Sequence, residues 1–271
     1  MDTSHYLDVL ACPNCQGAIS PSLECKGCGR SFATSGNVIQ MVPEAPRRGG
    51  HWGTQLVSII EFGQQGAPTY HHDRFSTLRG RWKNLRERAI VDGFLARLPR
   101  GSWVVDVPCG MGRFEDLALR RGLRACGIDL NLDHVTYAAG QITSSKVLWI
   151  QGDLAALPLR SDAMAAALCI RVSYYFDDDT LAQILAGVGR VASEVLLSYR
   201  DVGSVVGQWK SIRGRSSKSP WKNRTFRQIS NIAEQGGLRV AHGIRRRIRL
   251  HDMQFAHLVK EHGCGHRSLS R

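Results

Sequence analysis

Four cysteines near the start of the chain have the spacing of metal ligands. They form two pairs, Cys12 with Cys15 and Cys25 with Cys28, and nine residues separate the pairs. Two residues between paired cysteines let both thiolates of one turn reach the same ion, and two such turns complete a tetrahedron around zinc. A redox CxxC motif would normally occur once, on a βαβ unit. The spacing predicts one structural zinc, held by four thiolates in a closed site that is not catalytic.

A glycine-rich segment at residues 104–114 has the form of a ligand-binding loop. It reads Val-Val-Asp-Val-Pro-Cys-Gly-Met-Gly-Arg-Phe, an apolar run followed by a loop and the start of a helix. Gly110 and Gly112 let the loop turn tightly and let a ligand approach the backbone. A dinucleotide-binding loop would carry its third glycine where Glu115 stands, and a carboxylate there would repel a pyrophosphate at the helix N-terminus. S-adenosylmethionine (SAM) has a sulfonium cation and no phosphate, so this segment favours SAM over a dinucleotide.

The same segment resembles motif I of the class I SAM-dependent methyltransferases, an acidic residue followed by three alternating glycines. Asp106, Gly110 and Gly112 match the motif, and Pro108 replaces its first glycine. The resemblance extends over about residues 85–260. It implies that Asp129 accepts hydrogen bonds from the ribose hydroxyls of SAM and that Asp153 binds the adenine amino group. The expected cofactor-binding set is Asp106, Gly110, Gly112, Arg113, Asp129, Leu130, Asp153, Leu154 and Ile170.

Residues 7–43 resemble a second family. Around the cysteines, the runs Leu-Asp-Val-Leu-Ala before Cys12 and Val-Ile-Gln-Met-Val-Pro at 38–43 are similar to small zinc-ribbon proteins that partner and activate RNA and protein methyltransferases. In some bacteria such a ribbon is fused ahead of a methyltransferase domain. This resemblance therefore implies the same enzyme class as the glycine loop.

The residues that would act on the methyl acceptor are less clearly marked. Methyl transfer from a sulfonium is a direct displacement in which positioning supplies much of the rate, and a general base is needed only if the acceptor must lose a proton. Candidates near the pocket mouth are Arg171, Tyr174, Tyr175, Asp177, His71 and His72. Polar residues near strand ends more commonly serve packing, capping or the surface. The Asn/Asp-Pro-Pro-aromatic signature of exocyclic-amine methylation is missing at 171–176, where Arg-Val-Ser-Tyr-Tyr-Phe stands.

Basic residues are concentrated in the last quarter of the chain. Residues 207–250 hold twelve Lys or Arg against a single acid, Glu234, within a chain of net charge +13. Trp209, Lys210, Trp221 and Lys222 belong to this segment and are the expected substrate contacts. Aromatics among cations suit nucleotide bases with phosphates, but also a phosphorylated or sugar-linked small molecule or an anionic membrane surface.

Three functions are consistent with these features. The leading hypothesis is a SAM-dependent methyltransferase acting on an anionic small-molecule or glycan- or lipid-linked biosynthetic intermediate. The first alternative is a base methyltransferase for ribosomal or transfer RNA. The other, of a different class, is a non-catalytic adaptor for RNA or protein, against which the intact set of Asp106, both loop glycines, Asp129 and Asp153 argues.

The elements that must position these residues alternate between strands and helices. Apolar runs predict strands at 102–107, 125–129, 147–150, 163–170, 194–198, 238–250 and 253–260, with helices at 84–98, 114–121, 178–191 and 225–235. Alternation at this pitch predicts an α/β fold, a Rossmann-like parallel sheet with helices on both faces, which the resemblance completes with a final antiparallel strand. The expected units are a zinc ribbon at 1–43, a linker and helical segment at 44–84, the methyltransferase domain at 85–262 and a tail at 263–271.

Composition and the start of the sequence bear on the cellular location of the protein. No apolar run approaches the roughly 20 residues that cross a bilayer. The start of the chain has no basic region followed by an apolar stretch, unlike a signal peptide. We therefore expect a cytoplasmic protein without a transmembrane segment, in which the eight cysteines are thiols or metal ligands rather than disulfides. Peripheral association with an anionic surface remains compatible with the net charge.

Overall fold

The computed structural model describes residues 4–43, 77–205, 222–241 and 253–261 of the 271-residue chain. The helices are η1 (Ser4–Tyr6), α3 (Leu78–Leu95), α4 (Glu115–Arg120), α5 (Leu132–Gln141), η2 (Ser173–Tyr175), α6 (Asp178–Val191) and α8 (Phe226–Gln235). The strands are β1 (Thr34–Ser35), β2 (Val38–Gln40), β3 (Trp103–Asp106), β4 (Arg124–Asp129), β5 (Val147–Gln151), β6 (Met164–Cys169), β7 (Ala192–Arg200), β8 (Leu238–Val240) and β9 (Met253–Lys260).

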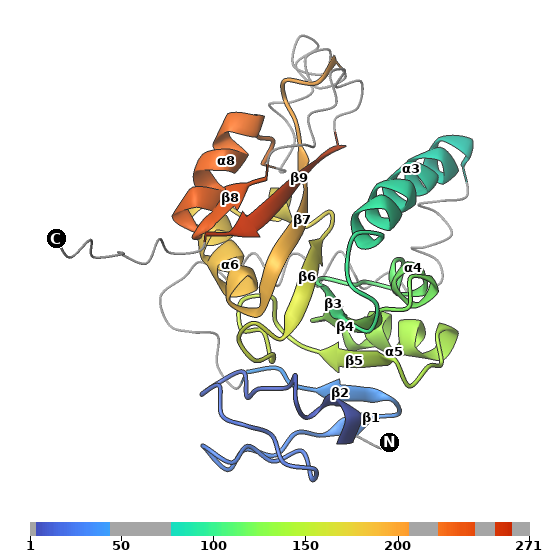
Figure 1. The fold of residues 1–271 in the computed structure, drawn as a ribbon, viewed down its shortest axis with the longest axis vertical. Coiled ribbons are helices and arrows are strands. Elements are labelled where there is room, and N and C mark those ends of the chain that lie inside the picture. Colours follow the sequence, from blue (N-terminus) through green and yellow to red (C-terminus); the bar gives the residue numbers. More distant parts are fainter. Residues whose placement is uncertain (1–3, 44–76, 206–221, 242–252, 262–271) are drawn as a thin grey trace, which may run out of the picture.

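The nine strands of the described residues form one twisted sheet in the order β1-β2-β5-β4-β3-β6-β7-β9-β8 (Figure 1). The six strands from β2 to β7 in this order pair in parallel, whereas β9 runs antiparallel to β7 and β8. The expected parallel sheet with a final antiparallel strand is therefore confirmed.

Local capping explains where several helices begin. Asp177 accepts a hydrogen bond from the Thr180 N–H at the start of α6, and Thr225 and Gln228 form a reciprocal capping box at the start of α8. These helices lie where the sequence predicted them. The helix predicted at 84–98 begins earlier, at Leu78, because Thr77 caps it by accepting from the Gly80 N–H.

Helix α5 was not predicted from the sequence. Asn131 caps its first turn by accepting from the Asp133 and His134 N–H groups. Val135, Ala138 and Ala139 are buried on one side of the helix, at the spacing of a single helical face. The spacing of these three apolar residues is the feature of the sequence that could have predicted α5.

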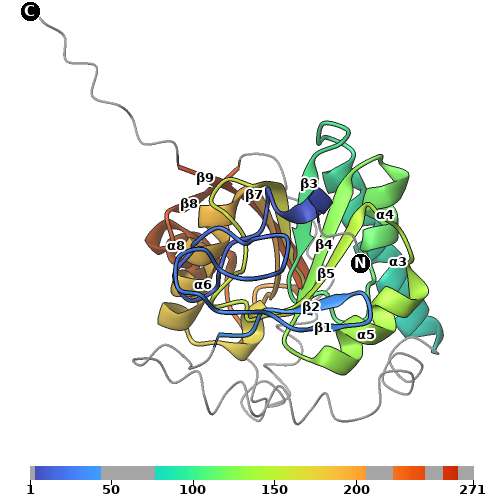
Figure 2. The ribbon, with the colours of Figure 1, turned by 90° about the horizontal axis from the view of Figure 1, so that it is seen from below.

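Helices cover both faces of the sheet, as a mostly parallel sheet requires (Figures 1 and 2). Helices α3, α4 and α5 pack on one face through a cluster that includes Phe94, Leu117 and Val135. Helices α6 and α8 pack on the other face through a cluster that includes Leu185 and Ile232.

The N-terminal unit, residues 4–43, fills the part of the second face that the helices leave open. The crossover from β5 to β6, residues 152–163, is described in full and contains no helix, although a parallel crossover usually has one. In its place, Leu10 forms an antiparallel bridge with Leu159, and both side chains are completely buried. The Tyr6 hydroxyl donates to the carbonyl of Ser145 at 2.9 Å.

This unit also extends the sheet. Strand β2 pairs in parallel with β5, and the Met41 N–H continues the ladder by donating to the Gln151 carbonyl at 2.8 Å (Figure 2). Most buried apolar side chains of the unit belong to the same core cluster as those of α6 and α8, whereas Val38 of β2 joins the cluster under α3, α4 and α5. Residues 4–43 therefore share one sheet and one core with the remainder of the fold. The boundary expected between residues 84 and 85 falls inside α3.

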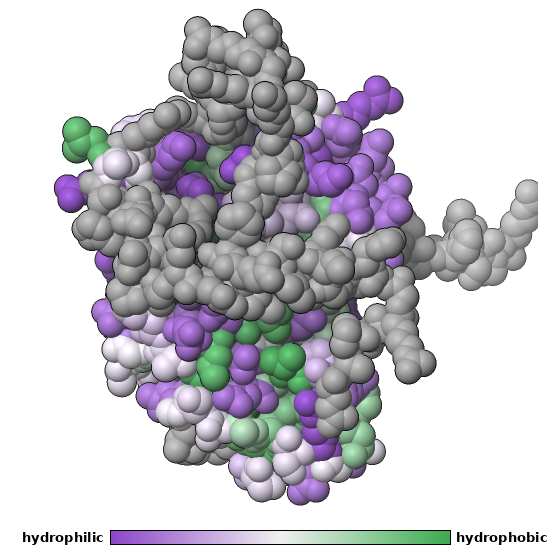
Figure 3. All heavy atoms as spheres, turned by 180° about the vertical axis from the view of Figure 1, so that it is seen from behind, coloured by the Kyte–Doolittle hydropathy of each residue, from purple (hydrophilic) through white to green (hydrophobic). Residues whose placement is uncertain are grey.

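The surface away from the view of Figure 1 is uneven in character. Where residues are not drawn in grey, hydrophilic side chains predominate towards the top of this view, and patches of hydrophobic ones gather in its lower half (Figure 3). Among the described residues, no helix combines the length and apolar character needed to cross a membrane.

We expect the N-terminal unit and the sheet to unfold together. Leu10→Ala removes a completely buried side chain from their shared core, and such truncations cost about 2–5 kcal/mol of unfolding free energy. Leu78→Ala is the matched control, because Leu78 is 84% exposed and should change stability by about 0.5 kcal/mol or less. Urea unfolding followed by tryptophan fluorescence and by far-ultraviolet circular dichroism measures both. If the fluorescence and circular dichroism transitions of Leu10→Ala occurred at different urea concentrations, and the sheet unfolded as in the wild type, the two parts would not share one core.

Candidate functional site

The glycine loop lies at the carboxyl end of β3, between β3 and α4. Gly110 and Gly112 have φ values of +54° and +73°, in the left-handed region that side chains disfavour. Gly112 also has no room for a side chain, because a Cβ there would lie 3.0 Å from the Ala138 Cβ. Pro108, at the position of the motif's first glycine, follows a cis peptide bond.

The indole of Trp149 supports this loop from β5. Its ring crosses the neighbouring strand at Gly127, where a Cβ would lie 2.4 Å from Cζ3. The far end of the same ring lies 3.1 Å from the position of a Cβ at Gly112. Trp149 is 2% exposed. The glycine at 127 in β4 is therefore a packing requirement of the loop's support.

Asp129, at the end of β4, holds the loop in place. One carboxylate oxygen accepts from the Gly110 N–H at 2.9 Å, and the other accepts from the Asn131 N–H at 2.9 Å. Burial raises the pKa of Asp129, although these backbone hydrogen bonds oppose the rise. Each oxygen retains a further lone pair that could accept from a ligand.

Two acids beneath the loop are buried without sufficient partners. Asp106 is 4% exposed, and neither of its carboxylate oxygens has a hydrogen-bond donor in the described part of the chain. Glu115 is 1% exposed; one oxygen accepts from the Phe114 N–H at 3.2 Å, and the other has no partner there. Burial, and then the charge of Glu115, raise the pKa of Asp106 well above its usual value. Burial raises the pKa of Glu115 to about 7. Such an arrangement favours a proton or a cationic ligand.

The other expected cofactor residues lie at neighbouring strand ends. Asp153 follows β5, where its carboxylate accepts from the Ala155 N–H at 2.8 Å and burial raises its pKa. Leu154 packs partly buried against the core, and Ile170 is 5% exposed at the end of β6. Leu130 follows β4, and its carbonyl accepts from the Gln151 side chain at 3.2 Å. The structure thus gathers the expected set along one edge of the sheet.

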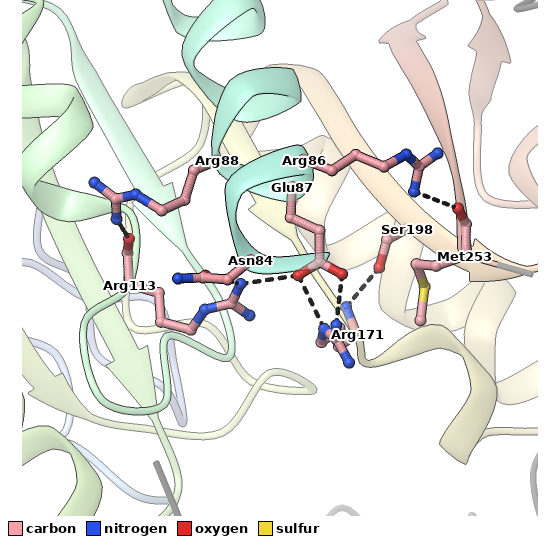
Figure 4. Close-up of polar contacts among 8 residues, drawn as sticks. All are labelled: Asn84, Arg86, Glu87, Arg88, Arg113, Arg171, Ser198 and Met253. Carbon is pink, nitrogen blue, oxygen red and sulfur yellow. Dashed lines mark hydrogen bonds and ion pairs between the residues drawn. The ribbon is translucent and has the colours of Figure 1, made fainter. Parts of the chain in front are cut away.

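Glu87 of α3 joins the loop to the end of β6 (Figure 4). Its carboxylate, 2% exposed, accepts from Arg113 at 2.8 Å and from Arg171 at 2.6 Å. Burial alone would raise the pKa of Glu87, but the charges and hydrogen bonds of the two arginines outweigh it and lower the pKa. Arg171 itself has φ +63°, and its N–H donates to the Ser198 hydroxyl at 2.5 Å.

Two further arginines fix α3 over this edge of the sheet (Figure 4). Arg86 donates to the Met253 carbonyl of β9 at 3.1 Å. Arg88 donates to the Arg113 carbonyl and pairs with Asp116 at 2.6 Å. Sequence reasoning did not identify Glu87. The one available signal was a single acid among the basic residues at 79–88.

The acceptor-side candidates fall into different environments. Tyr174 is 2% exposed, with Arg200 stacked over its ring at 4.6 Å, so it serves packing. Tyr175 is partly buried beside it, with ring centroids 4.8 Å apart. Lys222 is exposed, and its backbone N–H donates to the backbone carbonyl of Tyr174 at 2.9 Å. His72, Trp209, Lys210 and Trp221 lie outside the described residues.

The four N-terminal cysteines converge as the spacing predicted. The sulfurs of Cys12, Cys15, Cys25 and Cys28 all lie within 4.8 Å of one another. Gly17 lies against them, since a Cβ there would be 2.9 Å from the Cys25 sulfur. Four thiolate sulfurs in a cradle this tight form a donor set that suits tetrahedral zinc.

Comparison with known proteins agrees with this geometry. Residues 104–194 match a family described as a methyltransferase domain. No curated protein matches the sequence significantly.

Solved structures share the fold. Magnesium protoporphyrin IX methyltransferase from Synechocystis, with bound S-adenosylhomocysteine, has a TM-score of 0.60 at 14% identity, over 76% of this chain and 100% of that one. A chain from the complex of the Haloferax volcanii Trm112 methyltransferase activator with a methyltransferase has a TM-score of 0.52 at 19% identity, over 72% and 99%. A TehB-like SAM-dependent methyltransferase from Corynebacterium glutamicum has a TM-score of 0.51 at 19% identity, over 72% and 98%. Residues 104–194 are therefore a methyltransferase domain with the fold of SAM-dependent methyltransferases, and the chain is an enzyme.

We expect Glu87→Gln to destabilise the protein by about 3 kcal/mol at pH 7, because it removes the shared partner of two largely buried arginines. The lowered pKa of Glu87 means that its contribution is present above its unfolded pKa of about 4.3 and is lost as the pH falls through the folded value. The difference in unfolding free energy between wild type and variant should therefore be smaller at acid pH. Urea unfolding at pH 7 and pH 3 measures it.

The matched control is Glu234→Gln, at an exposed position on α8. It should leave stability within about 0.5 kcal/mol at both pH values. Equal stability of Glu87→Gln and wild type at pH 7 would refute the bridging role of Glu87.

Proposed function

We propose that this enzyme binds SAM at the carboxyl ends of β3, β4 and β5 and transfers its methyl group to an anionic small-molecule or lipid-linked acceptor. The observation that carries the donor assignment is the pair of buried Asp106 oxygens without donors beside the glycine loop. A ligand with an ammonium and a sulfonium group would supply these oxygens with the positively charged partner that the protein does not provide.

The same carboxylates argue against a dinucleotide. Asp106, Glu115 and Asp129 surround the loop and are all at least partly buried. A pyrophosphate at the N-terminus of α4 would lie beside Glu115, the residue in the first turn of that helix. A phosphate there would lie against carboxyl groups that already lack donors, and α4 has only six residues, so the site favours a cation.

Each expected residue has a distinct task in this proposal. Asp106 faces the charged methionine portion, and the loop at Gly110 and Gly112 brings backbone close to the ligand. Asp129 offers its remaining lone pairs to the ribose hydroxyls, while Asp153 and Leu154 bind the adenine. Arg113, Leu130 and Ile170 complete the lining.

When bound, SAM supplies an activated methyl group, and the chain's own residues position the acceptor. Arg171 lies at the end of β6, with its guanidinium oriented by Glu87. An arginine remains protonated at neutral pH, so Arg171 attracts and orients an anionic group and does not accept a proton. Among the described candidates, Tyr175 is the one that could exchange a proton with the acceptor.

The basic segment at 207–250 supports an anionic acceptor. The Synechocystis enzyme acts, by its name, on a small-molecule acceptor, which is consistent with this choice. RNA carries the same charge and is the competing acceptor.

We also propose that Cys12, Cys15, Cys25 and Cys28 bind one structural zinc, and that residues 7–43 are a built-in ribbon of the methyltransferase-activator type. The convergence of four sulfurs supports the metal. Pairing of β2 with β5, which would otherwise be the last strand on that side of the sheet, supports a stabilising role for the ribbon.

We expect Asp106→Asn to weaken SAM binding at least tenfold, about 1.4 kcal/mol, because the variant lacks the negative charge opposite the ligand's cation. The variant should be no less stable than wild type, since it removes a buried carboxylate without donors. Equilibrium dialysis with labelled SAM measures the affinity, and Asp133→Asn, at an exposed position on α5, is the control. Unchanged affinity in Asp106→Asn would refute the assigned role.

The acceptor class is tested by methyl transfer. Purified enzyme and SAM labelled in the methyl group are added to fractionated lysate, with and without ribonuclease. We expect label in a fraction of small or lipid-linked molecules that ribonuclease leaves unchanged, because the acceptor is not RNA. Label that disappears with ribonuclease would replace this acceptor with RNA.

Metal analysis tests the ribbon. We expect one zinc per chain in the wild type and none in Cys28→Ala, because three thiolates leave the tetrahedron incomplete. Cys126→Ala is the control: Cys126 is buried in β4 away from the cluster, so this variant should keep its zinc. A full zinc complement in Cys28→Ala would exclude the four-cysteine site.

A further inference from the structure

Two buried acids, Asp106 and Glu115, lie close together beneath the glycine loop. Asp106 stands opposite Gly127 in the parallel ladder between β3 and β4. Paired residues of neighbouring strands point to the same face of the sheet, and the strands are about 4.8 Å apart. A Cβ at Gly127 would lie 2.9 Å from Oε1 of Glu115. The carboxyl group of Glu115 therefore lies over Gly127, beside the Asp106 side chain.

This pair of acids has too few hydrogen-bond donors for two ionised carboxylates. Three of its four oxygens are buried and have no hydrogen-bond partner among the described residues. The fourth accepts from the Phe114 N–H at 3.2 Å. Two negative charges so close together in the interior would repel each other without compensation. The geometry therefore favours a pair that keeps a proton while no cation is bound at the loop.

The groups that surround the pair do not remove this conflict. Arg113 of the loop is the cation that acts on both acids, and it is already paired with Glu87 of α3. Asp129 at the end of β4 and Asp116 of α4 add further negative charge. The other titratable groups close to this cluster are Cys109 of the loop, Cys126 of β4, Cys169 of β6 and His134 of α5.

We propose that the pair formed by Asp106 and Glu115 releases a proton to solvent when the cationic cofactor binds at the loop, so that cofactor affinity depends on pH. This inference rests on the proposed function, which places SAM at the loop. A positive charge within about 4–6 Å of a carboxyl group favours its ionised form. The interior screens charge weakly, so the cation acts on both buried groups without touching them. One proton leaves the pair as the positive charge of the ligand arrives.

The direction of the pH dependence follows from the state of the pair before binding. Burial raises the pKa of Glu115 to about 7, and burial together with the charge of Glu115 raises the pKa of Asp106 well above its usual value. Below about pH 7 the free protein therefore holds the proton that the bound protein has lost. Affinity for SAM should rise as the pH rises through this range, and it should level off where the free pair is already ionised.

Titration calorimetry of the full chain with SAM measures the proton release. At pH 6.5, titrations in two buffers of different ionisation enthalpy give the number of protons from the difference in heat. The α-amino group of SAM is mostly protonated at this pH, because such groups have a pKa of about 7.7–8.0. We expect release of at least about half a proton per SAM, and affinity about threefold higher or more at pH 7 than at pH 6.

Three variants assign the proton. Glu115→Gln leaves Asp106 without its charged neighbour, so the pKa of Asp106 falls and at most about half as many protons should be released. His134→Gln tests the nearby imidazole, whose own pKa range also includes neutral pH, and should release protons as the wild type does. Asp133→Asn, exposed on α5, is the matched control and should also behave as the wild type.

The outcomes separate this inference from the function on which it rests. SAM binding with equal heats in both buffers would overturn the proton release and leave the SAM site intact. Wild-type release by Glu115→Gln, or loss of release in His134→Gln, would overturn the assignment to the buried acids. Absence of SAM binding by the folded wild-type chain would refute the proposed function and this inference with it.

Discussion

Burial of negative charge beneath the glycine loop limits what this pocket can bind. Asp106 ends the central strand β3, and Glu115 begins α4, so both carboxyl groups lie where the sheet and helix cores meet. A buried carboxylate without donors is costly unless it takes up a proton or faces a cation. The raised pKa values of Asp106 and Glu115 are a consequence of that cost. A cationic cofactor relieves it and a phosphate aggravates it, which is why the loop suits SAM although its glycine pattern alone would be ambiguous.

The rest of the fold packs around this edge of the sheet. Trp149 supports the loop from below, and α3 closes it from the side through Glu87. The strand that carries Trp149 would be an exposed edge next to an uncovered face if residues 4–43 did not pair with it. The cysteine cluster lies in that unit. A metal there would stabilise the unit that pairs with β5, the strand on which the loop rests, and that bridges to the crossover after β5 at Leu159.

Local pattern predicted most of this architecture. The strands and the positions of Asp106, Asp129 and Asp153 at their ends follow from short apolar runs that end in polar residues. The pairing of β2 with β5 joins residues more than a hundred positions apart, and no local signal contains it. Glu87 looks in sequence like a solvated acid within a basic helix; only the packing of α3 across the sheet edge buries it. Asp129 was expected to face the ribose, and its hydrogen bonds to the loop backbone depend on the loop's folded shape.

Titration calorimetry of the full chain with SAM and with NAD, at neutral pH, tests the central claim most directly. The claim is that buried carboxylates make the loop a site for a cationic nucleoside and exclude a pyrophosphate. It predicts one SAM bound per chain and no detectable heat with NAD. Binding of NAD, or absence of SAM binding by the folded chain, would contradict it.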